Sequence, residues 1–148
     1  QSRQTGQAGL RFNSLLCGCT SGARRSRMEL IKKSEIKILS NPGVESFQLL
    51  NPENSKSKRI TITRVLVQPN NEQPRHKHDT SEQIWIAVRG KGILLLADNK
   101  EEVFEPGDVV RFADEDIHGL KNNSQDVFGY ISVTSPPINF GYAYKDKK

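Results

Sequence analysis

Apolar and polar residues alternate in short runs along most of this chain. Residues 60–67 show the pattern best, because Ile, Thr and Val recur there and β-branched side chains suit the surface of a sheet. Turn-forming Pro, Gly, Asn and Asp interrupt the runs about every eight to twelve residues. The pattern predicts strands over residues 44–50, 60–67, 82–89, 93–97, 102–104, 109–112 and 127–134.

The two flanks of this series are less regular. Residues 28–39 predict a short strand or a single helical turn near Ser34. Near the other end Phe140, Tyr142 and Tyr144 alternate with other residues, which predicts a strand with one buried face. No long helical pattern and no internal repeat is present, so the predicted fold class is all-β, a sandwich or a barrel.

Length and composition predict one folded domain. The chain has 148 residues, of which 34% are apolar, and a β-rich domain can build a core from that share because each strand buries one face. Residues 1–27 differ from the rest, being rich in Gly, Ser, Gln and Arg. We expect residues 1–27 to be an N-terminal extension, upstream of the domain or artificially added, and held by a sheet edge or a neighbouring subunit. Residues 28–148 then form the single domain, and Met28 reads as a natural start.

The net charge of +5 does not indicate nucleic-acid binding. Five of the 22 basic residues lie in residues 1–27, which contain no acid, and the remaining 17 equal the 17 acidic residues. The charge excess belongs to the extension alone, so the predicted domain needs no basic face.

Both cysteines, Cys17 and Cys19, also lie in the extension. A single Cys-x-Cys pair is too little for a zinc site and forms no disulfide framework. The apolar run beside it is too short for a secretory signal, and no stretch approaches the roughly twenty apolar residues of a membrane helix. These features predict a soluble protein of a reducing compartment, the cytoplasm.

The three histidines of the chain carry its clearest chemistry. His76 and His78 share a face if they lie on a strand, and Glu82 has the same parity. A buried carboxylate beside imidazoles is costly unless a divalent cation neutralises it. His118 follows a predicted strand and a turn, from which a barrel would bring it across. Together the four side chains predict one metal site.

The same parity assigns two faces to residues 82–89. The face of the histidines would carry Ile84, Ile86 and Val88, and the opposite face would carry Gln83, Trp85 and Ala87. An outward tryptophan suits packing against another sheet or subunit, so Trp85 favours a homodimer.

The spacing of these residues resembles the two motifs of the cupin family. The first motif is a glycine, five residues, His-x-His, three or four residues, Glu, six residues and a glycine; here Asn70, His76, His78 and Glu82 fit, with Gly90 one place late. The second is a glycine, five residues, Pro-x-Gly, two residues, His, three residues and Asn. Here Gly107, His118 and Asn122 match it, and Ala113 and Glu115 stand at the positions of Pro and Gly.

The resemblance spans about residues 44–135 and implies a double-stranded β-helix, or jelly-roll, barrel with His76, His78, Glu82 and His118 as metal ligands. Asn70 is a mild departure, because Asn tolerates the left-handed region. Ala113 and Glu115 replace Pro and Gly, so we expect the turn before His118 to adopt a different backbone. Small cupins are commonly dimers, which agrees with the interpretation of Trp85.

Other residues are assigned mainly structural roles. Tyr130 and Arg64 lie on strands expected to line the barrel, and Asn122 is expected to stabilise a turn. Arg75 and Lys77 are expected to face solvent. Phe104, Phe112 and Phe128 are expected in the core or an interface. No glycine-rich phosphate loop and no Ser-His-Asp arrangement is present, so no organic cofactor is expected.

Three nitrogens and one carboxylate oxygen suit Mn, Fe, Co, Ni, Cu or Zn, without a choice among them. Four protein ligands leave open positions on an octahedral ion, as catalysis requires. The first hypothesis is therefore a metalloenzyme acting on an oxygen-rich small molecule, of the isomerase, lyase or dioxygenase type, with Glu82 as a candidate base. The alternative is a cupin that binds or senses a sugar or metabolite without turnover. A storage role is the third hypothesis, which the small size and full ligand set argue against.

Overall fold

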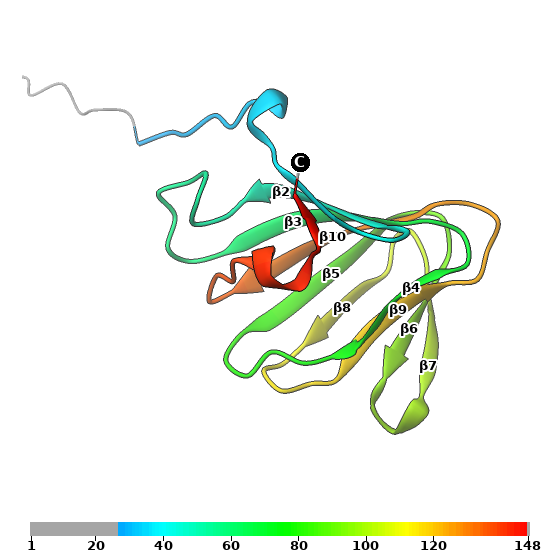
Figure 1. The fold of residues 1–148 in the computed structure, drawn as a ribbon. Coiled ribbons are helices and arrows are strands. Elements are labelled where there is room, and N and C mark those ends of the chain that lie inside the picture. The colour runs from blue at the N-terminus through cyan, green and yellow to red at the C-terminus, as the bar shows by residue number, and fades with distance from the viewer. Residues whose placement is uncertain (1–26, 148) are drawn as a thin grey trace, which may run out of the picture.

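The computed structural model describes residues 27–147, and these form two antiparallel sheets that face each other (Figure 1). The larger sheet contains, in spatial order, β11 (Asp146–Lys147), β1 (Ile38–Asn41), β2 (Val44–Leu50), β3 (Thr61–Val67), β10 (Phe128–Ser135), β5 (Glu82–Arg89) and β8 (Val109–Phe112). The smaller sheet contains β4 (Asn71–His76), β9 (His118–Asn122), β6 (Gly92–Leu96) and β7 (Glu101–Phe104). Three short 3-10 helices, η1 (Lys33–Glu35), η2 (Ala97–Asn99) and η3 (Phe140–Ala143), complete the described elements.

The alternating pattern placed most of these strands correctly. All seven predicted strands are present with small shifts at their ends. Residues 28–39, where a short strand or a helical turn was expected, contain η1 and the start of β1. The all-β fold class is confirmed. The strand predicted from the alternation of Phe140, Tyr142 and Tyr144 is absent, because Phe140 and Tyr142 lie in η3. The Asn139 side chain caps this helix by accepting from the N–H of Gly141. The predicted extension, residues 1–27, lies outside the described part except for Arg27.

The inner face of the larger sheet is apolar at one end and polar at the other. Strand pairing aligns Val44, Val67 and Phe128 in one row, and these buried side chains form the core with Phe104 and Leu120. Towards the opposite end the aligned buried residues are polar, because hydroxyl and amide side chains occupy the inward positions of β2, β3, β10 and β5. These are Ser46, Gln48, Thr61, Thr63, Ser132, Thr134 and Gln83. Buried polar groups need hydrogen-bond partners, so this end of the barrel differs in chemistry from the apolar core.

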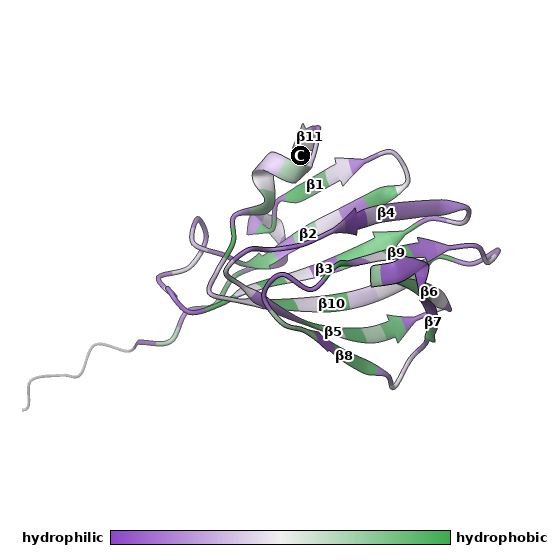
Figure 2. Cartoon of the chain, turned by 90° about the horizontal axis from the view of Figure 1, so that it is seen from below, coloured by the Kyte–Doolittle hydropathy of each residue, from purple (hydrophilic) through white to green (hydrophobic). Residues whose placement is uncertain are grey.

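The parity prediction for residues 82–89 is wrong. Trp85 is only 2% exposed and lies in the core with Gln83 and Ala87 facing inward, whereas Ile86 and Val88 face outward. The cause is the segment between His78 and Glu82, which is not a strand and therefore does not transmit the period of two. Figure 2 shows β4 coloured as hydrophilic, in contrast to the more apolar β5 and β8.

Residues 138–145, which we call the C-terminal segment, cross the polar end of the larger sheet. The Thr61 hydroxyl donates to the carbonyl of Ile138 at 2.8 Å, and the Asn41 side chain bonds both the carbonyl of Ala143 and the N–H of Lys145. These bonds hold the segment over the interior of the barrel. Across residues 27–147, no helix is long and apolar enough to cross a membrane.

Candidate metal centre

The three histidines converge at the polar end of the barrel. His76 is the last residue of β4 and His118 the first of β9, and the two are paired across the antiparallel ladder. His78 lies two residues beyond β4. One ring nitrogen from each histidine can be chosen so that all three lie within 4.8 Å of one another. His78 and His118 are buried, and His76 is the most exposed of the three.

Backbone contacts fix this convergence. Glu115, where the second motif has glycine, adopts the left-handed conformation with φ 66°, and its N–H donates to the carbonyl of His78 at 2.7 Å. The turn therefore forms without glycine and ties the two histidine-bearing segments together. Gly119 allows β9 to approach β4, because a Cβ there would lie 2.7 Å from the carbonyl oxygen of Gln73.

The imidazole rings are oriented by their Nδ1 atoms. Nδ1 of His76 lies 2.8 Å from the carbonyl of Pro74, and Nδ1 of His118 lies 2.7 Å from the carbonyl of Asp116. A carbonyl only accepts, so each Nδ1 carries the proton and each Nε2 presents its lone pair. Phe112 stacks on His118 with ring centroids 4.3 Å apart and holds that ring in place.

Gln83 supplies a fourth polar group. Its Oε1 accepts from the indole N–H of Trp85 at 3.0 Å, and its Nε2 donates to the hydroxyl of Thr134 at 3.0 Å, so the orientation of the amide is fixed. Oε1 also lies 3.1 Å from Nε2 of His118. If His118 is neutral, the lone pair on its Nε2 faces a lone pair on Oε1 of Gln83, which is unfavourable. A cation bound by both atoms would remove this repulsion.

Burial keeps two of the rings neutral. The pKa of His118 is lowered to about 4, mainly because burial penalises the charged ring, and secondly because His76 lies nearby. The pKa of His78 is lowered to about 4 for the same two reasons. Nε2 of His78 is buried and has no hydrogen-bond partner. Neutral imidazoles with free, buried lone pairs fit a divalent transition metal ion.

The structure does not bring Glu82 to the histidines. Its carboxylate bonds Nε of Arg111 at 2.6 Å on the outer face of the larger sheet, and the metal-competent group consists of His76, His78 and His118. The prediction that Glu82 shares the histidine face is wrong, for the same reason as that for Trp85. Glu82 is likewise displaced from the position in which it could act as a base.

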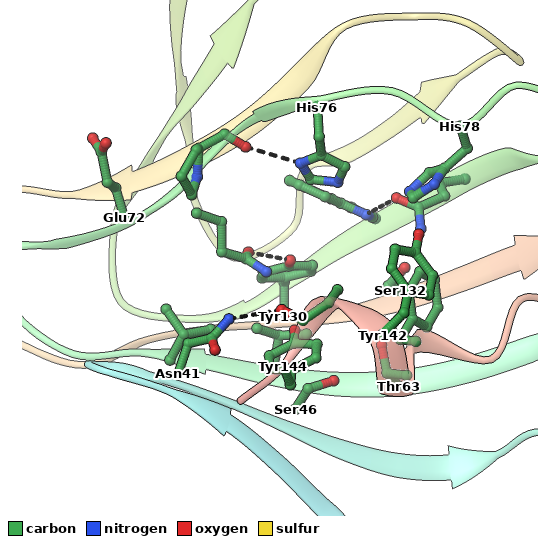
Figure 3. Close-up of a pocket in the computed structure, with 18 of the residues that line it drawn as sticks. Asn41, Ser46, Thr63, Glu72, His76, His78, Tyr130, Ser132, Tyr142 and Tyr144 are labelled. Carbon is green, nitrogen blue, oxygen red and sulfur yellow. Dashed lines mark hydrogen bonds between the residues drawn. The ribbon is translucent and has the colours of Figure 1, made fainter. Parts of the chain in front are cut away.

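A cavity of about 690 Å³ adjoins the histidines, within the size range of small-molecule pockets. His76, His78 and Gln83 line it at one side, and Figure 3 shows Ser46, Thr63, Ser132 and Tyr130 on the side across from β4. The C-terminal segment contributes the remaining wall through Phe140, Tyr142, Ala143, Tyr144 and Lys145. The site therefore opens into a cavity lined by both polar and apolar side chains.

Comparison with known proteins agrees with this geometry. The sequence model of the cupin domain matches residues 63–134, which include every histidine. The barrel also superposes on solved cupin-fold structures. The chain belongs to the cupin superfamily.

Three similar proteins illustrate the range of this cupin's relatives. The uncharacterized protein MJ1618 of Methanocaldococcus jannaschii is 26% identical over 122 residues, covering 80% of this chain and 94% of that protein. KdgF from a Halomonas species superposes with a TM-score of 0.63 at 18% identity, covering 74% of this chain and 96% of that one. Ectoine synthase from P. lautus gives 0.66 at 13% identity, covering 82% and 88%. The two structural matches establish the fold.

The cupin motif itself contained the signal for Gln83. The first motif allows three or four residues between His-x-His and the acid, and four residues lead to Gln83. Six further residues then lead to Gly90, which removes the one-residue offset seen with Glu82. In this cupin a neutral amide occupies the position of the acid.

Two tyrosines contribute hydrogen-bonding groups to the cavity of the cupin. The hydroxyl of Tyr130 donates to Oε1 of Gln73, and Tyr144 forms hydrogen bonds with Ser46 and Gln73. Burial raises the pKa of both tyrosines, that of Tyr130 well above its ordinary value. Both hydroxyls therefore stay protonated near neutral pH and serve as hydrogen-bond groups.

Of the remaining residues assigned from the sequence, Tyr130 and Asn122 lie as predicted and Arg64 does not. Tyr130 lines the interior as predicted, whereas Arg64 faces outward with its guanidinium 4.3 Å from the Phe47 ring centroid. Asn122 stabilises a turn as expected, because its amide donates to the carbonyls of Val67 and Asp126. Lys77 lies at the rim of the cavity and pairs with Asp79 and Glu115.

Proposed function

We propose that this cupin binds one divalent transition metal ion through His76, His78, His118 and the amide oxygen of Gln83. The observation that carries the proposal is the fixed opposition of two lone pairs, on Gln83 Oε1 and His118 Nε2, inside a buried group of three histidines. Imidazole ligands favour Zn, Cu, Fe or Ni among the candidate metals.

We further propose that the cupin is an enzyme for an oxygen-rich small molecule, of the isomerase, lyase or dioxygenase type. A bound metal ion would supply Lewis acidity towards a substrate oxygen. The chain supplies a cavity lined by the hydroxyl groups of Tyr130 and Tyr144, and the Phe140 ring lies edge-on to His78 with ring centroids 5.8 Å apart. These residues would bind the substrate, orient it and exclude water.

Binding without turnover is the second candidate, and one observation favours it. Among the described residues that line the cavity, Glu72 is the single carboxylate, and it is exposed. Acid–base chemistry at the histidines therefore has no carboxylate beside it. If this reading is correct, the ligand leaves the cavity chemically unchanged after incubation with the metal-loaded protein.

Metal content tests the proposal. The protein is purified without a metal-affinity column and analysed by mass spectrometry, and Zn²⁺ or Ni²⁺ is then titrated into chelator-treated protein by calorimetry. We expect one ion per chain in the wild type and loss of stoichiometric binding in His76→Ala. Substoichiometric or mixed metal in the wild type would refute the proposed site.

Glu82→Gln is the matched control. It removes an acid six residues from His76 but leaves Gln83 and the histidines unchanged, so we expect wild-type metal affinity. Loss of metal in Glu82→Gln would instead restore the ligand set predicted from the sequence. Once an activity is found, dioxygen uptake separates the dioxygenase type from the isomerase and lyase types.

We also propose that the cupin forms a homodimer through the outer face of β10, β5 and β8. Ile86, Val88 and Val109 are exposed there, Val109 at 64%, and Ile86 is aligned with both Val109 and Ile131. Arg111 and Glu82 place both charge signs beside this apolar surface. A second copy related by a two-fold axis could therefore bury the apolar residues and pair opposite charges. Light scattering that gives the monomer mass of 16.7 kDa would reject the dimer.

A further inference from the structure

Two hydroxyl groups in the cavity have no partner within residues 27–147. Ser132 is 4% exposed, and its Oγ is buried without a hydrogen bond. Thr63 is 3% exposed, and its hydroxyl likewise forms no hydrogen bond in the described part of the chain. The two residues are directly paired across β10 and β3, and both line the cavity. Residues paired in this way have Cβ atoms about 5 Å apart, so the two hydroxyls form one subsite.

Neighbouring hydroxyls on the same strands are bonded to protein. Thr61, two residues before Thr63, donates to the carbonyl of Ile138. Thr134, two residues after Ser132, accepts from the amide of Gln83. Buried polar groups are rarely left unpaired, so the unpaired Oγ of Ser132 is available to a ligand in the cavity, and the Thr63 hydroxyl lies beside it. Among the described residues two further buried side-chain atoms lack a partner, Nε2 of His78 at the metal site and Oε1 of Gln48, which does not line this cavity.

The subsite lies at a defined distance from the histidines. Gln83 precedes Trp85 by two residues on β5, and Trp85 is paired with Ser132 on β10. From strand rise and spacing, the Cα of Ser132 is about 8 Å from that of Gln83, and the Cα of Thr63 is about 12 Å away. An extended six-carbon chain with an oxygen at each end is about 9 Å long, which matches the separation of Ser132, and the Thr63 side chain lies directly beside Ser132. A ligand held at the histidines therefore reaches both hydroxyls with its other end.

Charge distinguishes the two ends of this ligand. Three neutral imidazoles and an amide leave the charge of a bound cation uncompensated, which favours an anionic, chelating head group. The hydroxyl subsite is uncharged, and no arginine lines the cavity among the described residues. Lys77, one of the two lining lysines, is already paired with Asp79 and Glu115. The part of the ligand that contacts Ser132 and Thr63 is accordingly polar and uncharged.

We infer that the cavity binds a polyhydroxylated carboxylic acid of about six carbons, with its carboxylate and adjacent hydroxyl at the metal and its chain hydroxyls bonded to Ser132 and Thr63. This inference rests on the proposed metal site and specifies the substrate class for it. The two unpaired hydroxyls supply the selectivity against acids that carry an alkyl chain.

Three probes test the inference by calorimetry on Zn²⁺-loaded protein. D-Gluconate and D-galactonate carry hydroxylated chains of opposite configuration at one carbon, and 2-hydroxyhexanoate has the same chelating head with an alkyl chain. We expect at least one sugar acid to bind about tenfold more tightly than 2-hydroxyhexanoate, as two neutral hydrogen bonds provide. In Ser132→Ala with Thr63→Val this preference should disappear, while the affinity for 2-hydroxyhexanoate stays within about twofold.

A control variant separates binding from folding. Thr61→Val removes a hydroxyl from the same strand and face, but one that is bonded to the Ile138 carbonyl. We expect Thr61→Val to lower Tm and keep the probe preference, whereas Ser132→Ala keeps Tm because it breaks no internal bond. A Tm loss in Ser132→Ala equal to that in Thr61→Val would overturn the inference.

The outcomes distinguish the two proposals. A wild-type protein that binds no stoichiometric Zn²⁺ refutes the proposed metal site. A protein that binds Zn²⁺ but holds 2-hydroxyhexanoate as tightly as both sugar acids refutes the polyhydroxylated ligand and leaves the metal site intact.

Discussion

At the scale of single residues, Gln83 changes the chemistry that the sequence pattern implied. With Glu82 as ligand, the site would carry one negative charge and hold a base beside the metal. With Gln83 the site has four neutral donors, one of them locked by Trp85 and Thr134. If the proposed ligand set holds a cation, the site would favour an anionic ligand, because the four protein donors would leave the charge of that cation uncompensated.

The variant Gln83→Glu tests this electrostatic reading. A carboxylate of the same length can still accept from the Trp85 indole, and it adds a charge that attracts the cation. We expect tighter Zn²⁺ binding, by about tenfold or more, together with weaker binding of D-gluconate. Calorimetric titration of both ligands measures the two effects. Unchanged affinity for Zn²⁺ would place Gln83 outside the ligand set.

The lowered pKa values of His78 and His118 give a signed pH dependence. The folded pKa of each is about 4, below the 6.5 of the unfolded chain, so between these values the unfolded state binds more protons. Stability of the metal-free protein should fall as pH drops from about 6.5 to about 4, by up to about 1.4 kcal/mol per pH unit for each ring. Urea unfolding across this range measures it. A double variant with Gln at both positions should give a flatter profile, and an equally steep one would contradict this account.

At the scale of elements, strands were predictable where one face is buried and turns are marked by Pro, Gly or Asn. The sequence could not reveal which residues of a strand face the interior when an irregular segment separates that strand from the preceding one. Residues 77–81 form an irregular link, so parity read from His76 assigned Glu82 and Trp85 to the wrong sides. Two aromatic residues of the C-terminal segment, Phe140 and Tyr142, lie in η3, because local capping by Asn139 outweighed their alternation.

The close approach of β4 and β9 can be tested at Gly119. An added Cβ would meet the backbone oxygen of Gln73 at 2.7 Å, and backbone atoms cannot move aside cheaply. We expect Gly119→Ala to cost about 1–3 kcal/mol in urea unfolding and to weaken Zn²⁺ binding, since it separates His76 from His118. Gly129→Ala is the control, because the one tight contact of its Cβ would be with the flexible Leu66 side chain at 3.1 Å, and the other neighbours lie at ordinary contact distances. Equal effects of the two variants would argue against a special constraint at Gly119.

At the scale of the whole molecule, the cupin assignment and the barrel followed from motif spacing. The argument for a dimer from an outward-facing Trp85 was wrong. Trp85 is internal, and the exposed apolar surface belongs to residues that the sequence had placed inside. The two motifs singled out the three histidines, and the structure brings those side chains together. The hydroxyl subsite was out of reach, because Ser132 and Thr63 are 69 positions apart and meet only through strand pairing.

The variant Val109→Glu tests the proposed dimer face. It puts a charge at the most exposed apolar position of β8 and leaves the interior of the barrel unchanged. We expect the wild type to scatter light as a dimer and Val109→Glu as a monomer, because burying unpaired carboxylates across the interface is costly. Val103→Glu, an exposed position on the other sheet, should remain dimeric. Dissociation by both variants would exclude a specific interface on the larger sheet.

The placement of the site across both sheets has a mechanical consequence. His76 and His118 belong to the smaller sheet and Gln83 to the larger one, so an ion held by all three is a cross-link between the two layers. Its removal should allow the layers to separate locally without unfolding the apolar end. Amide hydrogen exchange in β4 and β9 should therefore slow by about tenfold or more on Zn²⁺ addition, while exchange around Val67 and Phe128 stays nearly constant. Binding of a metal ion would therefore make the end of the barrel that contains the site more rigid.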